Sequence, residues 1–157
     1  TISLKKKSEK VQALIGKIVD GFETRAGQEQ KSIIINGSGD TMLYCDPDWM
    51  TEALGNLVKN ALDHIGAGGR VDIAWHETPV VTRITVKDDG SGIHPEDIHH
   101  IFKRFYRSRF SQDTQGIGLG LALAQSIVEA HDGTITAEST LGQGSLFTVD
   151  FLKLTNL

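Results

Sequence analysis

The sequence predicts an α/β fold in which a largely antiparallel sheet carries helices on one face. Apolar residues recur at helical spacing in three separate segments, and two short alternating strands follow each segment. The order is therefore a helix, two strands, a helix, two strands, a long loop, a helix and two strands. This order is typical of helices packed on one side of a single sheet.

The composition indicates one globular domain that covers residues 1–157. Hydrophobic residues make up 39% and charged residues 23% of the chain, and a chain of this length can bury roughly two-thirds of its unfolded surface. No apolar run approaches the roughly 20 residues of a membrane span. We expect a cytoplasmic domain, because a single cysteine fits a reducing cytosol. The formal net charge of -4 argues against a nucleic-acid partner. The single Cys45 excludes an internal disulfide.

The first helix is predicted over residues 11 to about 26. Its apolar face consists of Val11, Leu14, Ile15, Ile18, Val19 and Phe22. We expect residues 1–10 to form a solvated tail or the end of a preceding helix. Two short strands, residues 32–35 and 42–45, are joined through the glycine-rich segment 36–40.

The second helix is predicted over residues 47–65, with Asp46 as its N-cap and Pro47 in its first turn. Asn56 and Asn60 lie one turn apart on its polar face. Asn has a poor helix propensity, so the pair indicates either a solvated surface or a functional role. The predicted core face contains Met50, Leu54, Leu57, Val58, Ala61 and Ile65, and the polar face also contains Glu52, Lys59 and Asp63.

The rest of the chain alternates between strands, turns and one helix. Strands are predicted over residues 70–76, 80–88, 134–139 and 145–152, and a helix over residues 122–131. Pro95 begins a short predicted helix that ends near residue 102. The polar segment 103–115 has no clear period, and we expect a mobile loop there.

The stretch that follows the strand 80–88 combines a carboxylate with two glycines. Asp88 has the same strand parity as Ile84 and Val86, so its side chain is predicted to point into the core. A carboxylate in that position needs hydrogen-bond donors. Gly90 and Gly92 would leave room for a flat ligand close to the backbone. Taken alone, the stretch is also typical of an ordinary Asp-Gly turn.

A glycine-rich segment, residues 116–120, leads directly into the last helix, where backbone N–H groups and the helix dipole favour an anion. It lacks the preceding strand of a dinucleotide fold and the Gly-Lys-Ser/Thr of a Walker loop. Four cations lie within residues 103–109, and aromatic residues are interleaved with them. Asn60 could supply one oxygen to Mg2+. Together these parts describe a site for an adenine nucleotide, with the base at Asp88.

The chain resembles the catalytic, ATP-binding domain of sensor histidine kinases, within the gyrase and heat-shock chaperone type of ATP-binding fold. Residues 56–61 resemble the N box, residues 88–93 the first glycine box and residues 102–107 the F box. Residues 116–121 resemble the second glycine box, and residues 142–147 a short last one. The resemblance implies a two-layer α/β sandwich of a mixed, largely antiparallel sheet with about three helices on one face, the Bergerat-type fold. It also implies an ATP lid over residues 103–115.

The resemblance implies ATP and Mg2+ as ligands and a phosphoryl transfer from ATP to histidine. Asp88 would bind the adenine amino group, Asn60 would hold Mg2+ with support from Asn56, and Arg107 would reach the γ-phosphate as the catalytic residue. The residues implied to bind ATP are Asn56, Asn60, Asp88, Gly90, Gly92, Ile93, Tyr106, Gly116, Gly118, Leu119, Gly120, Leu121 and Ser145. The sequence departs from the family pattern at Asp63, often Lys or Arg, and at His64, often aromatic.

None of the six histidines is in the context of a phosphate acceptor. The resemblance places the acceptor on an upstream dimerisation domain of the same protein, so this chain should bind ATP as a monomer without autophosphorylation. A homodimeric parent anchored in the cell membrane and a response-regulator partner are implied. The alternatives are a clamp or chaperone-type ATPase and a degenerate nucleotide-binding module of the same fold.

Overall fold

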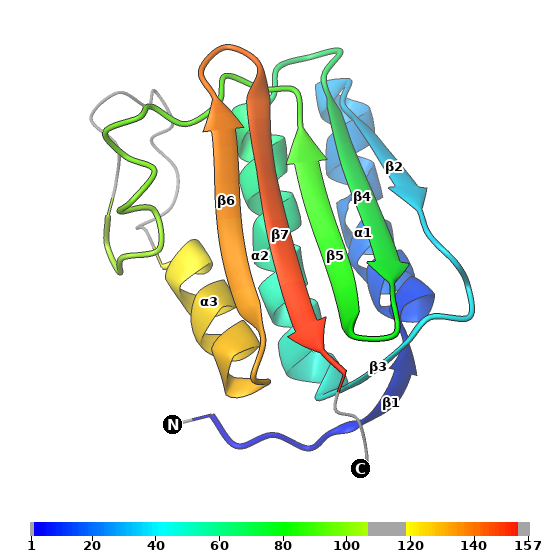
Figure 1. Ribbon diagram of the computed structural model, residues 1–157. Helices are drawn as coiled ribbons and strands as arrows, with labels where there is room; N and C mark the ends of the chain where they lie inside the picture. Colours follow the sequence, from blue (N-terminus) through cyan, green and yellow to red (C-terminus); the bar gives the residue numbers. More distant parts are fainter. Residues whose placement is uncertain (1, 107–118, 154–157) are drawn as a thin grey trace.

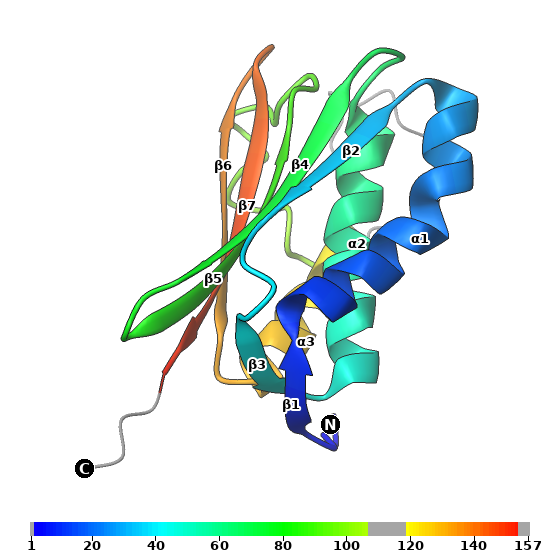
Figure 2. The ribbon, with the colours of Figure 1, turned by 90° about the vertical axis from the view of Figure 1, so that its right-hand side faces the viewer.

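The computed structural model describes residues 2–106 and 119–153 and has two layers. Figures 1 and 2 show a five-stranded sheet whose one face is covered by three helices. The helices are α1 (Val11–Glu29), α2 (Pro47–His64) and α3 (Gly120–Ala130). The strands are β1 (Lys7–Lys10), β2 (Ser32–Asn36), β3 (Met42–Cys45), β4 (Arg70–Glu77), β5 (Val81–Asp88), β6 (Thr134–Thr140) and β7 (Gly144–Leu152).

The main sheet has the strand order β2-β4-β5-β7-β6. β2 is parallel to β4, and the other three pairs are antiparallel. The sheet is therefore mixed and largely antiparallel, which confirms the predicted fold class. None of the helices in the described part of the chain is long and apolar enough to cross a membrane.

The first ten residues contain a strand that the sequence analysis did not expect. β1 pairs antiparallel with β3 in a separate two-stranded sheet. The expectation of a tail or helix end is thus corrected for Lys7–Lys10. The run of polar side chains concealed this strand, because pairing with β3 satisfies its backbone while its side chains stay mostly exposed.

Strands β2 and β3 follow each other in sequence but belong to different sheets. Their connection passes close to Trp75 of β4, whose indole Nε1 donates a hydrogen bond to the carbonyl of Ser38 at 2.7 Å. A Cβ atom on Gly37 would lie 2.2 Å from the same indole ring, so only glycine fits there. This connection takes the chain from the main sheet to the two-stranded sheet, and α2 follows directly after β3.

The helices begin and end close to where the sequence predicts. The Asp46 carboxylate caps α2 by accepting hydrogen bonds from the N–H groups of Asp48 and Trp49. Helix α1 runs three residues further than expected and ends at Glu29, and the left-handed backbone of the next residue, Gln30 (φ 58°), forms the C-cap. One cluster of buried apolar residues fills the space between the helices and the sheet, and its largest fully buried members are Phe147, Ile15, Met50, Leu54, Leu57 and Leu62.

The prediction of a short helix from Pro95 to about residue 102 is wrong. Residues in this segment form successive turns in which Asp97, His100 and Lys103 each donate a backbone hydrogen bond to the carbonyl three residues earlier. The backbone of this segment is not helical. The bonds are three residues apart, so each closes a separate turn and none continues into an α-helical ladder.

Candidate functional site

Asp88, the last residue of β5, lies between two neighbouring strands. It pairs with Val71 of β4 and with Ser145 of β7. Its side chain is only 3% exposed and lies on the same face as the buried Ile84 and Val86. The strand parity therefore predicted its direction correctly. Both β5 and α2 end at the top of Figure 1, and the N–H of Ser91, just after β5, donates to the carbonyl of His64 at the end of α2.

The Asp88 carboxylate is held by backbone donors on one side. Its Oδ1 accepts a hydrogen bond from the N–H of Gly90 at 2.9 Å. Burial raises the pKa of Asp88, whereas the N–H groups of Gly90 and Ser145 and the nearby His64 act in the opposite direction. Burial has the largest effect, so this carboxyl group takes up a proton more readily than an exposed aspartate.

The glycines after Asp88 allow close backbone packing. A Cβ atom on Gly90 would lie 2.2 Å from the carbonyl oxygen of His64, at the end of α2. Gly92 has a φ of +77°, and a Cβ atom there would lie 2.5 Å from the carbonyl oxygen of Thr140. The structure therefore gives both glycines a packing role, and room for a flat ligand beside them stays a prediction.

The first glycine box is joined directly to the turn between β6 and β7. The N–H of Ile93 donates to Ser139 Oγ at 2.6 Å, and the N–H of Gly142 donates to the carbonyl of Ser91 at 2.7 Å. Ser139 Oγ also lies 3.2 Å from Ser145 Oγ. Two motifs that are about 50 residues apart in sequence thus form one structural unit.

Asn56 and Asn60 project from α2 one turn apart, and both are half-buried. The side-chain nitrogen Nδ2 of Asn56 is buried and has no hydrogen-bond partner among the described residues. An unpaired buried amide is costly, so this nitrogen needs an acceptor that the described protein atoms do not supply. The solvated-surface interpretation therefore fails for Asn56.

The start of α3 lies against Asn56. A Cβ atom on Gly120 would lie 3.7 Å from the Asn56 side chain. Leu119 occupies the N-cap position and makes no side-chain hydrogen bond to the helix. Leu121, the next predicted ligand contact, is half-buried against the core. Within the described residues, no side-chain cap is therefore seen on the N–H groups of the first turn, which suits an anion.

The predicted residues Arg107, Gly116 and Gly118 lie outside the described residues, as does most of the predicted lid 103–115. Among the residues that are described, no group of three or more His, Cys, Asp or Glu side chains could hold a metal ion. An amide ligand such as Asn60 together with phosphate oxygens remains compatible with Mg2+.

Phe102 and Tyr106 of the F box contact the body of the protein, whereas Phe105 is 62% exposed. The ring of Phe102 meets that of Phe147 edge to face, with centroids 6.1 Å apart. The hydroxyl of Tyr106 donates a hydrogen bond to the carboxylate of Asp97, which is buried. Asp97 was not singled out from sequence, because a lone aspartate in a turn gives no signal.

Asp63, the departure from the family pattern, contacts neighbouring side chains on α1 and α2. Its two carboxylate oxygens accept hydrogen bonds from Arg25 Nη2 at 2.7 Å and from Lys59 Nζ at 2.9 Å. The spacing of Lys59 and Asp63 predicts the second contact. The contact with Arg25 joins residues 38 apart in sequence, and no local pattern predicts it.

Residues 45–156 match the family described as histidine kinase-, DNA gyrase B-, and HSP90-like ATPase. The chain is 45% identical over 114 residues to the sensor histidine kinase RppB of Synechocystis sp., covering 71% of this chain and 25% of that protein. It is 37% identical over 136 residues to the adaptive-response sensory kinase SasA of Synechococcus elongatus, covering 85% of this chain and 35% of that protein. The chain thus spans only a quarter to about a third of the length of these two curated relatives.

The fold is similar to that of the solved catalytic domain of the histidine kinase ThkA. The TM-score is 0.82 and the identity 26%, over 95% of this chain and 96% of that one. A further ThkA structure is a complex with the response regulator protein TrrA, and its TM-score is 0.81 over 96% of this chain and 42% of that one.

Proposed function

Because this chain belongs to the histidine kinase-, DNA gyrase B-, and HSP90-like ATPase family, as a catalytic domain of the sensor histidine kinase type, we propose that it binds Mg-ATP and phosphorylates a histidine. The acceptor lies on a separate dimerisation domain. The observation that carries this proposal is the buried Asn56 amide nitrogen, which has no acceptor among the described residues and lies beside the start of α3. A bound phosphate would supply that acceptor.

In this proposal Asp88 reads the adenine base. An ionised carboxylate accepts hydrogen bonds and donates none, so it selects a base with an exocyclic amine. Its burial supports the role, because a buried carboxylate gains more from a further hydrogen-bond donor than an exposed carboxylate does. The turn after Asp88 is fixed by Gly90, Gly92 and Ile93. Ser145 contributes by pairing with Asp88 across the sheet.

The phosphates would extend from the base along α2 toward the start of α3. Asn56 donates to a phosphate oxygen, and the backbone N–H groups of Leu119, Gly120 and Leu121 complete the anion site with Gly116 and Gly118. Mg2+, when bound, neutralises phosphate charge, and the amide oxygen of Asn60 is the protein ligand we assign to it. Tyr106 would hold the start of the segment that carries Arg107.

The transfer itself needs positioning and charge compensation from the protein. The bond between the γ-phosphorus and its bridging oxygen breaks, a bond to a histidine ring nitrogen forms, and ADP leaves. Arg107 compensates charge on the γ-phosphoryl group. Asp63 has no direct role in this step, because both of its oxygens are already bound to cations.

The alternative of a clamp or chaperone-type ATPase is disfavoured by Asn56. The resemblance places a glutamate at this position in those enzymes, where it activates water. An amide cannot act as a general base, so hydrolysis by this chain should be slow. A degenerate binding module would retain nucleotide affinity without transfer.

The kinase proposal is tested by mixing this chain with a separately prepared dimerisation domain from the same parent and γ-labelled ATP. We expect acid-labile phosphate on that domain and none on this chain alone. Rapid hydrolysis by this chain alone would favour the ATPase, and binding without transfer would favour the degenerate module. We further propose a parent that is homodimeric, anchored in the membrane and paired with a response regulator.

A further inference from the structure

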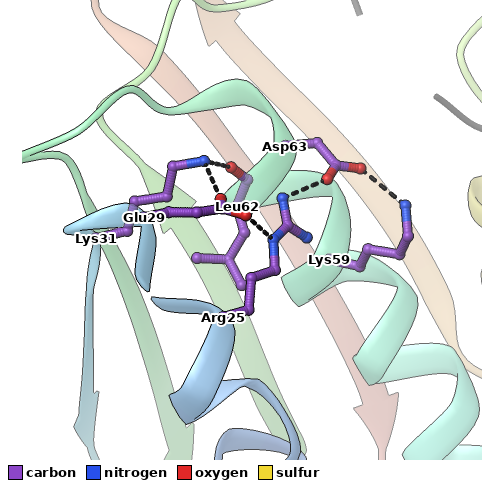
Figure 3. A network of polar contacts seen from close by, with 6 residues as sticks. All are labelled: Arg25, Glu29, Lys31, Lys59, Leu62 and Asp63. Atoms are coloured by element: carbon purple, nitrogen blue, oxygen red, sulfur yellow. Dashed lines mark hydrogen bonds and ion pairs between the residues drawn. The ribbon is translucent and has the colours of Figure 1, made fainter. Parts of the chain in front are cut away.

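A chain of charged contacts joins the C-terminal ends of α1 and α2 (Figure 3). Arg25 lies at its centre, with Nη2 donating to Asp63 at 2.7 Å and Nε donating to Glu29 at 3.0 Å. Lys59 occupies the other oxygen of Asp63. The Asp63 side chain is only 10% exposed, so water screens these contacts less than it would on an open surface.

The same network also reaches the backbone of α2. Lys31 Nζ donates to Glu29 at 2.7 Å and to the carbonyl oxygen of Leu62 at 2.8 Å. That carbonyl belongs to the last turn of α2, where no further helical N–H is available to it. The last turn is therefore held at one side chain, Asp63, and at one carbonyl, Leu62.

The residue that follows this pair contacts the proposed adenine-binding turn. The carbonyl oxygen of His64 accepts a hydrogen bond from the N–H of Ser91 at 3.4 Å. Gly90 lies so close to this oxygen that no side chain would fit between them. A shift in the last turn of α2 would therefore be transmitted to Gly90, whose N–H binds Asp88.

We propose that Asp63 and Arg25 are positioning residues for nucleotide binding, acting through His64 on the Asp88–Gly92 turn. The inference rests on the proposed function, because it assigns a purpose to the same site. Although Asp63 is largely covered, Arg25 is 27% and Glu29 40% exposed, and partly exposed ion pairs usually add little to the free energy of folding. The effect of this pair should consequently be larger on nucleotide affinity than on overall stability.

The test compares Asp63→Asn, Arg25→Gln and the double variant with the wild-type chain. The matched control is Arg83→Gln, which breaks a two-bond ion pair with Asp150 on the opposite face of the sheet. We expect each single variant to raise the Kd for ADP by roughly three- to tenfold, and the control to leave it unchanged. The Kd of the double variant should not exceed that of the single variant with the higher Kd, because both residues act through one contact.

Amide resonances provide a readout that a general loss of stability would not change. The N–H signals of Gly90 and Ser91 should shift in both single variants, without ligand, and should stay in place in Arg83→Gln. If Asp63→Asn unfolds, Arg25→Lys serves instead, since it keeps the charge but loses the forked geometry.

Wild-type affinity and unshifted amide signals in the single variants would overturn the inference. If the wild-type chain itself fails to bind ADP, the proposed function fails. The amide shifts in the ligand-free chain would then still decide whether the ion pair positions the turn.

Discussion

The imidazole Nε2 of His131 accepts a hydrogen bond from the backbone N–H of Asp46 at 3.0 Å. This contact joins the C-terminal end of α3 to the N-cap of α2. The other ring nitrogen, Nδ1, lies 2.7 Å from the carbonyl oxygen of Ile127, so it carries the proton. The ring is buried, and each of its nitrogens has one partner.

His131→Phe should lower the free energy of unfolding by about 1–3 kcal/mol, because the Asp46 N–H loses its acceptor in a buried place. Urea denaturation measures the change. His76→Phe, at an exposed position of β4, is the control and should stay within about 0.5 kcal/mol of the wild type. Equal stability of the two variants would contradict this role of His131.

Asp88→Asn should weaken ADP binding by about tenfold or more, because a hydrogen bond to a charged acceptor contributes about 1.5–3 kcal/mol. The volume and the acceptor for Gly90 are retained, so the variant should fold. Calorimetry provides the affinity. The control is Asp89→Asn, whose side chain accepts from the N–H of Arg70 at 2.8 Å and is exposed. An unchanged affinity in Asp88→Asn would exclude Asp88 as the residue that reads the base.

The raised pKa of Asp88 predicts opposite pH effects on stability and on binding. The folded state holds this proton more tightly than the unfolded state, so the stabilisation is complete below the unfolded pKa and is lost as pH rises through the folded value. Adenine binding needs the ionised form and should weaken as pH falls through that raised value. Measuring ADP affinity against pH in the wild type and in Asp88→Asn isolates the effect of Asp88 ionisation on binding. Parallel curves for the two proteins would refute this effect.

Gly90→Ala should destabilise the fold by about 1–3 kcal/mol, because the new methyl group would meet the carbonyl oxygen of His64. Gly66→Ala is the control, since a Cβ atom there has no neighbour within 4 Å. Thermal unfolding distinguishes the two variants. A Gly90→Ala protein as stable as Gly66→Ala would show that the turn can move away from α2.

Asn60→Ala should remove the dependence of ATP-analogue affinity on Mg2+, because the proposed protein ligand of the ion is lost. Binding is compared with Mg2+ and with a chelator present. The exposed Asn36→Ala on β2 should retain the wild-type difference. A Mg2+ effect that persists in Asn60→Ala would assign the ion to other ligands.

Periodicity predicted the fold class and the direction of Asp88, because both depend on local spacing. The three helices were predicted for the same reason. Strand β1 was not predicted, since its polar sequence becomes a strand only through pairing with β3, more than thirty residues away. The turns after Pro95 were mistaken for a helix, because proline begins both structures.

The candidate site was predicted less completely than the fold. The asparagine pair was visible as an unfavourable choice for a helix, but only the structure shows that Asn56 Nδ2 is buried without a partner among the described residues. The glycines at 90 and 92 are visible in the sequence, but only the structure shows that the carbonyls of His64 and Thr140 approach them closely. Backbone contacts between distant segments leave no pattern in the side-chain sequence.

The β1–β3 sheet also shows that the folding unit begins well before residue 45. The family match begins at residue 45, yet β2 pairs with β4 and α1 packs on α2. The backbone N–H of Lys5 bonds to the carboxylate that caps α2. A protease-resistant fragment should therefore begin before Lys5, and trimming to the boundary of the sequence family would remove part of the folding unit itself.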